Sequence, residues 1–245
     1  MLPEITPEEL SAVLDEVARD VLEQSGVEAP PVEPLLVAQS LGIRVVLDDR
    51  QPTRARCVRL QGIRGRPARS TILVRPEPRP ERRNWAVAHE IGEQLAWRVF
   101  AALSIDARVA APRARETVAN YLAGRLLVPG EWLAADAAEC DWDLPVLKRR
   151  YATASHELIA RRMLDMRPPV IITIVDEGQV YLRASNVPGL APPLQPAEAR
   201  CQQAVHRTGQ PHRLAANELG TVHGWPVHEE GWKREILRTV VDMLN

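Results

Sequence analysis

The sequence predicts a mixed α+β fold in two parts, and three observations support this prediction. Apolar residues recur at helical spacing in several stretches, most clearly over residues 7–25, 81–97 and 115–128. Short apolar runs at 43–47, 71–75 and 170–175 are bounded by turn-forming residues, as strands are. Arg167-Pro168-Pro169 interrupts the chain, so we expect one domain over residues 1–166 and a small α+β domain over 167–245.

Composition excludes several classes of protein. The 245 residues are 45% hydrophobic and carry a formal charge of −1, so no general attraction to nucleic acid or membranes follows. The three cysteines are widely spaced and form no CxxC pair, which favours reduced thiols. The N-terminus lacks an apolar signal segment, and no apolar run reaches bilayer length. We therefore expect a cytoplasmic protein without a membrane partner.

The elements before residue 80 follow from caps and breakers. Thr6 and Pro7 begin a helix that ends at Gly26, and a shorter helix is expected from Val32 to Leu41. Strands are then predicted over 43–47, 56–60 and 71–75. The last two are joined by a loop that is rich in arginine and contains Gly62, Gly65 and Pro67.

The helix over residues 81–97 carries the chemistry. His89 and Glu93 are four residues apart, so they project from the same helix face and could both bind one metal ion. Glu90 lies beside His89 and could act as a general base on a water molecule. This is the arrangement of the HExxH zinc-peptidase helix, with Glu93 in place of the second histidine. The alternative is a buried helix with a charged, solvated edge.

A second helix, over residues 115–128, offers a third ligand. Glu116 comes 23 residues after Glu93, and Asn120 follows one turn later in an otherwise apolar helix. A third carboxylate would complete a metal site with an open position for water. The alternative is an acidic residue that favours the positive end of a helix in its first turn.

The two segments ERRNWAVAHEIGE and RETVANYLAGRLLVP together resemble the ImmA/IrrE family of metallopeptidases. That family pairs an RxxFxxAHExxH helix with an ExxxN helix ending in LLxP. The resemblance spans about residues 7–165 and departs from the pattern at Glu93. It implies a zincin-like fold and a cytoplasmic, regulatory protease acting on a helix-turn-helix repressor. The matching residues are Arg82, Trp85, Ala88, His89, Glu90, Glu116, Asn120, Leu126, Leu127 and Pro129.

Residues 144–163 predict two short helices around Thr153-Ala154-Ser155, similar to the helix-turn-helix-like segment of that family. Arginines make this segment basic, so DNA contact is one interpretation and a solvated helix face is the favoured one. We therefore do not expect direct binding of nucleic acid. The arginines concerned are Arg149, Arg150, Arg161 and Arg162.

The C-terminal part predicts a hairpin over 170–175 and 179–183, a helix over 198–205, a strand over 222–227 and a closing helix over 232–244. It contains no cofactor-binding signature. Its four histidines, which lack ligand spacing, are expected to be structural or exposed. They are His206, His212, His223 and His228.

The favoured function is a divalent-metal-dependent endopeptidase, with His89, Glu93 and Glu116 as ligands and Glu90 as general base. Zinc is the expected ion, and manganese is the alternative because the site is rich in oxygen ligands. Strand 71–75 is expected to be the sheet edge along which a substrate peptide lies. The competing hypotheses are a non-catalytic binding or sensor relative with a degraded metal site, and a DNA-binding regulator.

Overall fold

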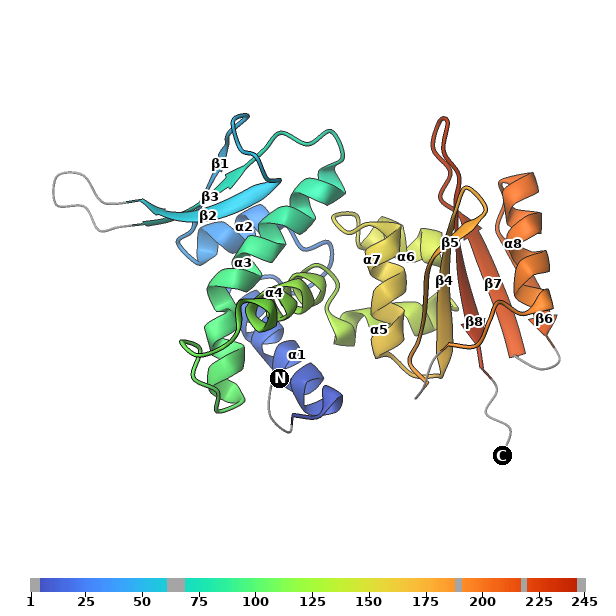
Figure 1. The fold of residues 1–245 in the computed structure, drawn as a ribbon, viewed down its shortest axis with the longest axis horizontal. Coiled ribbons are helices and arrows are strands. Elements are labelled where there is room, and N and C mark those ends of the chain that lie inside the picture. The colour runs from blue at the N-terminus through green and yellow to red at the C-terminus, as the bar shows by residue number, and fades with distance from the viewer. Residues whose placement is uncertain (1–4, 61–68, 188–190, 217–219, 242–245) are drawn as a thin grey trace. The chain divides into compact units, whose positions relative to one another are not determined.

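A computed structural model describes residues 5–60, 69–187, 191–216 and 220–241. It divides into two compact units. The first contains the chain up to Trp132 together with Arg150–Ser155, and the second contains Leu133–Arg149 and the chain from His156 onward. Both units combine helices with a sheet, so the predicted α+β class is confirmed (Figure 1). Within the described ranges no helix is both long enough and apolar enough to cross a bilayer.

The first unit begins with the predicted helices α1 (Pro7–Gln24) and α2 (Pro34–Ser40). The hydroxyl of Thr6 accepts a hydrogen bond from the Glu9 amide at 3.1 Å, so the predicted N-cap is confirmed. The apolar face of α1 is buried in the core of the unit, where it packs against α4 (Pro112–Leu127).

A three-stranded sheet follows, and its order corrects one prediction. Strands β1 (Arg44–Leu47), β2 (Ala55–Leu60) and β3 (Arg69–Val74) are arranged in the order β1-β3-β2. β3 runs parallel to β1 and antiparallel to β2, so it is paired on both sides. The prediction that strand 71–75 forms an edge is therefore wrong. The side chains of Ile72 and Val74 are buried in the core of the unit. The predicted loop over 61–68 lies outside the described residues.

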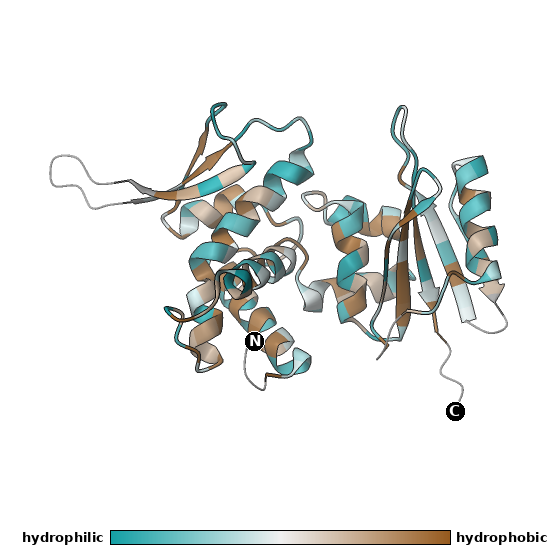
Figure 2. Cartoon of the chain, in the orientation of Figure 1, coloured by the Kyte–Doolittle hydropathy of each residue, from teal (hydrophilic) through white to brown (hydrophobic). Residues whose placement is uncertain are grey.

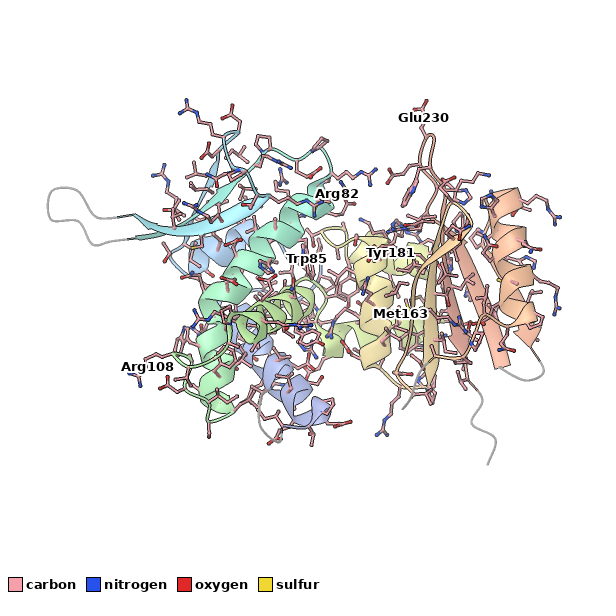
Figure 3. The ribbon with its side chains drawn as sticks, in the orientation of Figure 1. Arg82, Trp85, Arg108, Met163, Tyr181 and Glu230 are labelled. Carbon is pink, nitrogen blue, oxygen red and sulfur yellow. The ribbon has the colours of Figure 1, made fainter. Side chains whose placement is uncertain are left out.

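Helices α3 (Pro80–Ala102) and α4 pack closely against each other. At their contact a Cβ on Gly92 would lie 2.6 Å from the carbonyl oxygen of Ala119, so only glycine fits there. Arg82 and Trp85, two of the motif residues, lie in the first turns of α3 (Figure 3). Both helices begin earlier than predicted, and each has a proline in its first turn.

The next helices are α5 (Gly130–Glu139), which was not predicted, and the two predicted short helices α6 (Leu144–Arg150) and α7 (His156–Arg162). A 3₁₀ turn over Met163–Asp165 follows. Because α7 packs on strands of the second unit, most of the segment 144–163 belongs to that unit. The compact units thus divide at other places than residue 166. The domain boundary that the sequence predicts between residues 166 and 167 stays a prediction.

The second unit contains a five-stranded antiparallel sheet in the order β5-β4-β8-β7-β6. The strand β4 is hydrophobic along nearly its whole length (Figure 2) and is buried. Helix α8 (Pro196–Thr208) packs on β6, β7 and β8, and its N-terminus is held by a capping box between Gln195 and Glu198. The strands are β4 (Val170–Asp176), β5 (Gln179–Ser185), β6 (His212–Ala216), β7 (Gly220–Pro226) and β8 (Arg234–Val240).

The prediction of a closing helix over 232–244 is wrong. Residues 234–240 instead form β8, which pairs with β4 on one side and with β7 on the other. Ile236 and Leu237 are adjacent in the sequence and both are fully buried, so both faces of this strand are covered. A strand covered on both faces shows no alternation of polar and apolar residues, which explains the wrong interpretation. Residues 242–245 lie outside the described part.

Candidate metal centre

The structure brings the three predicted ligands together. His89 and Glu93 lie one turn apart on α3, and α4 carries Glu116 to the same place. Each side chain offers one potential ligand atom, and these three atoms all lie within 4.8 Å of one another. Since α4 begins at Pro112, Glu116 is past the first turn, and the alternative of a first-turn acid at a helix end does not apply. These three side chains are placed so that they could hold one metal ion.

Asn120 orients two of these side chains. Its Nδ2 donates to Glu116 Oε1 at 3.1 Å, so its Oδ1 is the acceptor that faces His89 Nδ1, also at 3.1 Å. The imidazole proton therefore belongs on Nδ1, and Nε2 keeps its lone pair. That Nε2 lies 3.6 Å from Glu116 Oε2. A ligand histidine held through its other nitrogen is the usual arrangement around protein-bound metals.

Glu90 lies beside these ligands but is turned toward the sheet. The backbone amide of Cys57 in β2 donates to Glu90 Oε2 at 2.6 Å. Burial raises the pKa of the Glu90 carboxyl, and the charges of Glu93 and Glu116 add to this rise. The Cys57 hydrogen bond opposes the rise, as a protonated His89 would. A glutamate with a raised pKa next to an open metal site is suited to accepting and returning a proton.

The donor set fits a divalent cation. It consists of one imidazole nitrogen and two carboxylates, whose two negative charges would balance the charge of the ion. Solvent reaches the cluster, since 18% of the His89 side chain and 56% of the Glu116 side chain are exposed. A ligand position would thus stay open for water or for a substrate oxygen.

The Cys57 thiol is near this centre without joining it. Burial raises its pKa, and the carboxylates of Glu90 and Glu93 raise it further. The cluster of potential ligand atoms consists of His89, Glu93 and Glu116, and the Cys57 sulfur is not part of it. Sequence reasoning missed Cys57 because its contact with Glu90 is made by the backbone amide, which any residue except proline could supply.

Strand β2 runs alongside α3 in the same direction. At one level, the Cys57 amide of β2 contacts Glu90 of α3. Two residues later in β2, Arg59 pairs with Ser70 of β3. Ser70 Oγ lies 3.5 Å from Oε1 of Gln94, which is four residues after Glu90 in α3. Two residues of strand and four residues of helix therefore cover about the same length, roughly 6 Å. Because the Cys57 amide points to Glu90 and not to β3, the free edge of β2 faces the metal centre.

Two of the four arginines of 144–163 are paired with acids. Arg161 pairs with Glu157 at 2.9 Å, and Arg162, which is almost fully buried, pairs with Asp165. Arginines that are neutralised in this way offer little charge to a phosphate backbone. These contacts favour the interpretation of the segment as a packing unit.

Two further features have structural explanations. In the second unit, His206 and His228 both contact the fully buried Glu235 at 2.9 Å, which fits the expected structural role for these histidines.

In the first unit, a cavity of about 410 Å³ lies between α1 and the start of α5. Its arginines are paired with acids, Arg125 with Asp15 and Arg19 with Glu131, and the cavity contains none of the proposed ligands.

Comparisons with known proteins show the family and the fold of the chain. The IrrE N-terminal-like domain family of peptidases matches residues 38–164, a range that contains the metal centre, Glu90 and β2. A solved structure described as a Mycobacterium tuberculosis transcriptional regulator shares the fold. Its TM-score is 0.63 at 20% sequence identity, over 96% of this chain and 80% of that chain. The comparison with curated proteins found no match.

Proposed function

Because the chain belongs to the peptidase family of the IrrE N-terminal-like domain, we propose that it is a divalent-metal-dependent endopeptidase. The observation that carries the proposal is the position of Glu90. The Cys57 amide holds one of its carboxylate oxygens, and the neighbouring residues His89, Glu93 and Glu116 form a cluster of potential ligands. A base fixed beside a metal site is the arrangement that metal-assisted hydrolysis requires.

In this proposal His89, Glu93 and Glu116 hold the ion, and Asn120 fixes the tautomer of His89. When bound, the ion supplies Lewis-acid chemistry, which polarises a peptide carbonyl and acidifies a water molecule. Zinc is the expected ion. Manganese is the alternative, because two of the three ligands are oxygens.

Glu90 supplies the proton transfers. Its free oxygen accepts a proton from the water that attacks the peptide carbonyl, and it then delivers that proton to the leaving nitrogen as the C–N bond breaks. The raised pKa of Glu90 in the metal-free protein brings it closer to neutral pH, where both transfers are efficient.

We place the substrate along β2, in place of the central β3 of the original prediction. The free edge of β2 faces the metal centre, and an extended peptide could add to that edge as a further strand. Backbone hydrogen bonds would then hold the peptide in a defined register. Antiparallel addition would make the peptide run opposite to β2, and hence opposite to α3.

The substrate that the family resemblance implies is a helix-turn-helix transcriptional repressor, and the role is regulatory. We also propose a cytoplasmic location, which is supported by Cys57, Cys140 and Cys201 being thiols that form no disulfide. A second candidate is a non-catalytic relative that binds a partner without cutting it. The residue that favours this second candidate is Glu93, which stands where the family pattern has histidine.

The test uses the full chain, stripped of metal and reloaded with zinc or manganese. A helix-turn-helix repressor encoded beside the gene is the substrate, and mass spectrometry identifies the products. Glu90→Gln should lower the rate on the order of 10²–10⁴-fold with unchanged metal content, because glutamine cannot accept the proton. Equal cleavage by the variant would remove Glu90 from this role. A repressor that binds but is never cut would favour the second candidate.

A further inference from the structure

Trp97 is an exposed aromatic residue on the helix that carries the proposed ligands. All six tryptophans lie in the described part of the chain, and Trp97 alone among them is exposed, with 58% of its surface accessible. Trp97 lies near the C-terminal end of α3, and a ligand that covers a tryptophan gains favourable burial. The position of Trp97 relative to the proposed metal centre indicates what that ligand is.

Helical geometry places Trp97 beside the expected path of the substrate. Trp97 follows Glu90 by seven residues of α3, which rotate the chain by about 20° less than two full helical turns. The Trp97 side chain therefore lies almost in line with Glu90 and about 10 Å farther along the helix. Around the helix axis it falls between Glu93 and Gln94. Glu93 belongs to the ligand cluster, and Gln94 faces the sheet through Ser70. Trp97 therefore lies on the strip of α3 between the metal centre and the sheet.

The Trp97 ring also has a basic neighbour. The Arg98 guanidinium lies 5.7 Å from the centre of the Trp97 ring, and its NH1 donates to Gln24 Oε1 at 3.3 Å. Arg98 thus connects the Trp97 ring to α1, while most of the ring surface stays accessible to a ligand.

We propose that Trp97 forms an apolar subsite that selects a large aliphatic or aromatic substrate side chain on the amino side of the scissile bond. This inference rests on the proposed function. Since β2 and α3 run in the same direction, a peptide added antiparallel to β2 passes Trp97 before it reaches Glu90. A distance of about 10 Å corresponds to about three residues of extended chain. The selected side chain is therefore within about three residues of the cleaved bond.

The first test compares cleavage sites in a peptide library for the metal-loaded full chain, Trp97→Ala, Trp97→Phe and Leu36→Ala. Leu36 is a matched control because it is also an exposed apolar residue in the first unit but lies on α2. We expect Trp97→Ala to lower kcat/KM about ten-fold for peptides with the large apolar residue and to leave alanine-substituted peptides unaffected. Trp97→Phe should restore most of the preference, and Leu36→Ala should keep it.

The second test needs no cleavage. Binding of a fluorescent peptide is measured for Glu90→Gln and for Glu90→Gln/Trp97→Ala, each with and without zinc. The double variant should bind the large apolar peptide about ten-fold more weakly. Equal binding by both proteins, or an apolar preference on the carboxyl side of the cut, would overturn the inference. Failure of the proposed function would look different: no cleavage that depends on Glu90, whatever the binding result.

Discussion

The backbone amide of Cys57 donates a hydrogen bond to the Glu90 carboxylate at 2.6 Å and so connects the edge of the sheet to the ligand helix. This contact fixes the direction in which the second carboxylate oxygen can act. It also uses one amide of the β2 edge, so a peptide strand that adds to this edge must bond to the neighbouring backbone groups. The base and the proposed substrate strand are therefore positioned by the same short stretch of β2.

The raised pKa of Glu90 predicts a dependence of stability on pH in the metal-free protein. Burial raises the pKa of this carboxyl above its ordinary value of 4.5, so folding favours the protonated form. The stabilising contribution of Glu90 is complete at low pH and is lost as the pH rises through the raised pKa. Glu90→Gln has no such loss. It should unfold at a higher urea concentration than the parent at pH 7.5, and the difference should shrink toward pH 4.

The measurement is urea unfolding in the presence of a chelator, at several pH values. Glu16→Gln, on the exposed side of α1, serves as the control and should behave like the parent at every pH. A Glu90→Gln protein that is equally or less stable at pH 7.5 would contradict the prediction.

Position 93 should control which ion is bound. Glu93→Ala removes one of three ligands and should weaken binding of zinc and of manganese strongly, as measured by calorimetry. Glu93→His would supply a second imidazole, and we expect it to tighten zinc binding, to weaken the preference for manganese and to lower the pH optimum of hydrolysis. Unchanged metal affinity in Glu93→Ala would show that Glu93 is not a ligand.

Asn120 should affect metal affinity without binding the ion itself. Its amide contacts both His89 and Glu116, so Asn120→Ala would free both side chains to rotate. Loss of such an orienting residue typically costs about 10–100-fold in metal affinity. Thr117→Ala on the same helix is a suitable control because the Thr117 hydroxyl donates to the Arg113 carbonyl, which is not a proposed ligand. Equal losses in both variants would contradict a specific role for Asn120.

Gly92→Ala tests the close approach of α3 and α4. The added methyl group would meet the Ala119 carbonyl oxygen at 2.6 Å, so the helices would have to separate. Overpacking of this kind costs about 1–3 kcal/mol, although alanine favours a helix by about 1 kcal/mol over glycine. We expect lower stability in thermal unfolding and weaker zinc binding. A variant with a higher melting temperature would show that the contact is not tight.

Much of the candidate site could be predicted because it depends on local spacing. His89 and Glu93 are four residues apart on one helix, and their shared face follows from helix geometry alone. Glu116 required a second observation, the ExxxN pattern on another helix. The contact between Cys57 and Glu90 could not be predicted, because a backbone amide leaves no mark on the choice of side chain.

The parts of the fold that were missed depend on partners distant in the sequence. β3 has alternating residues typical of an edge strand, but its position is decided by pairing with both β1 and β2. The sequence of β8 predicts a helix because both faces of the strand are buried, so its polar and apolar residues do not alternate. β6 was missed because its residues, His212 to Ala216, have weak strand propensity and gain their order from pairing with β7.

The contact between Gly92 and Ala119 also has a consequence for how the protein would respond to the supply of metal. The three ligands project from two helices that are already locked together by a buried core, so folding alone assembles the cluster. In small zinc domains, by contrast, the ion is needed for folding, and its removal unfolds the chain. Here a chelator should leave a folded, inactive protein that regains activity when metal returns. The ion would then be needed for the activity of the protein and not for its fold.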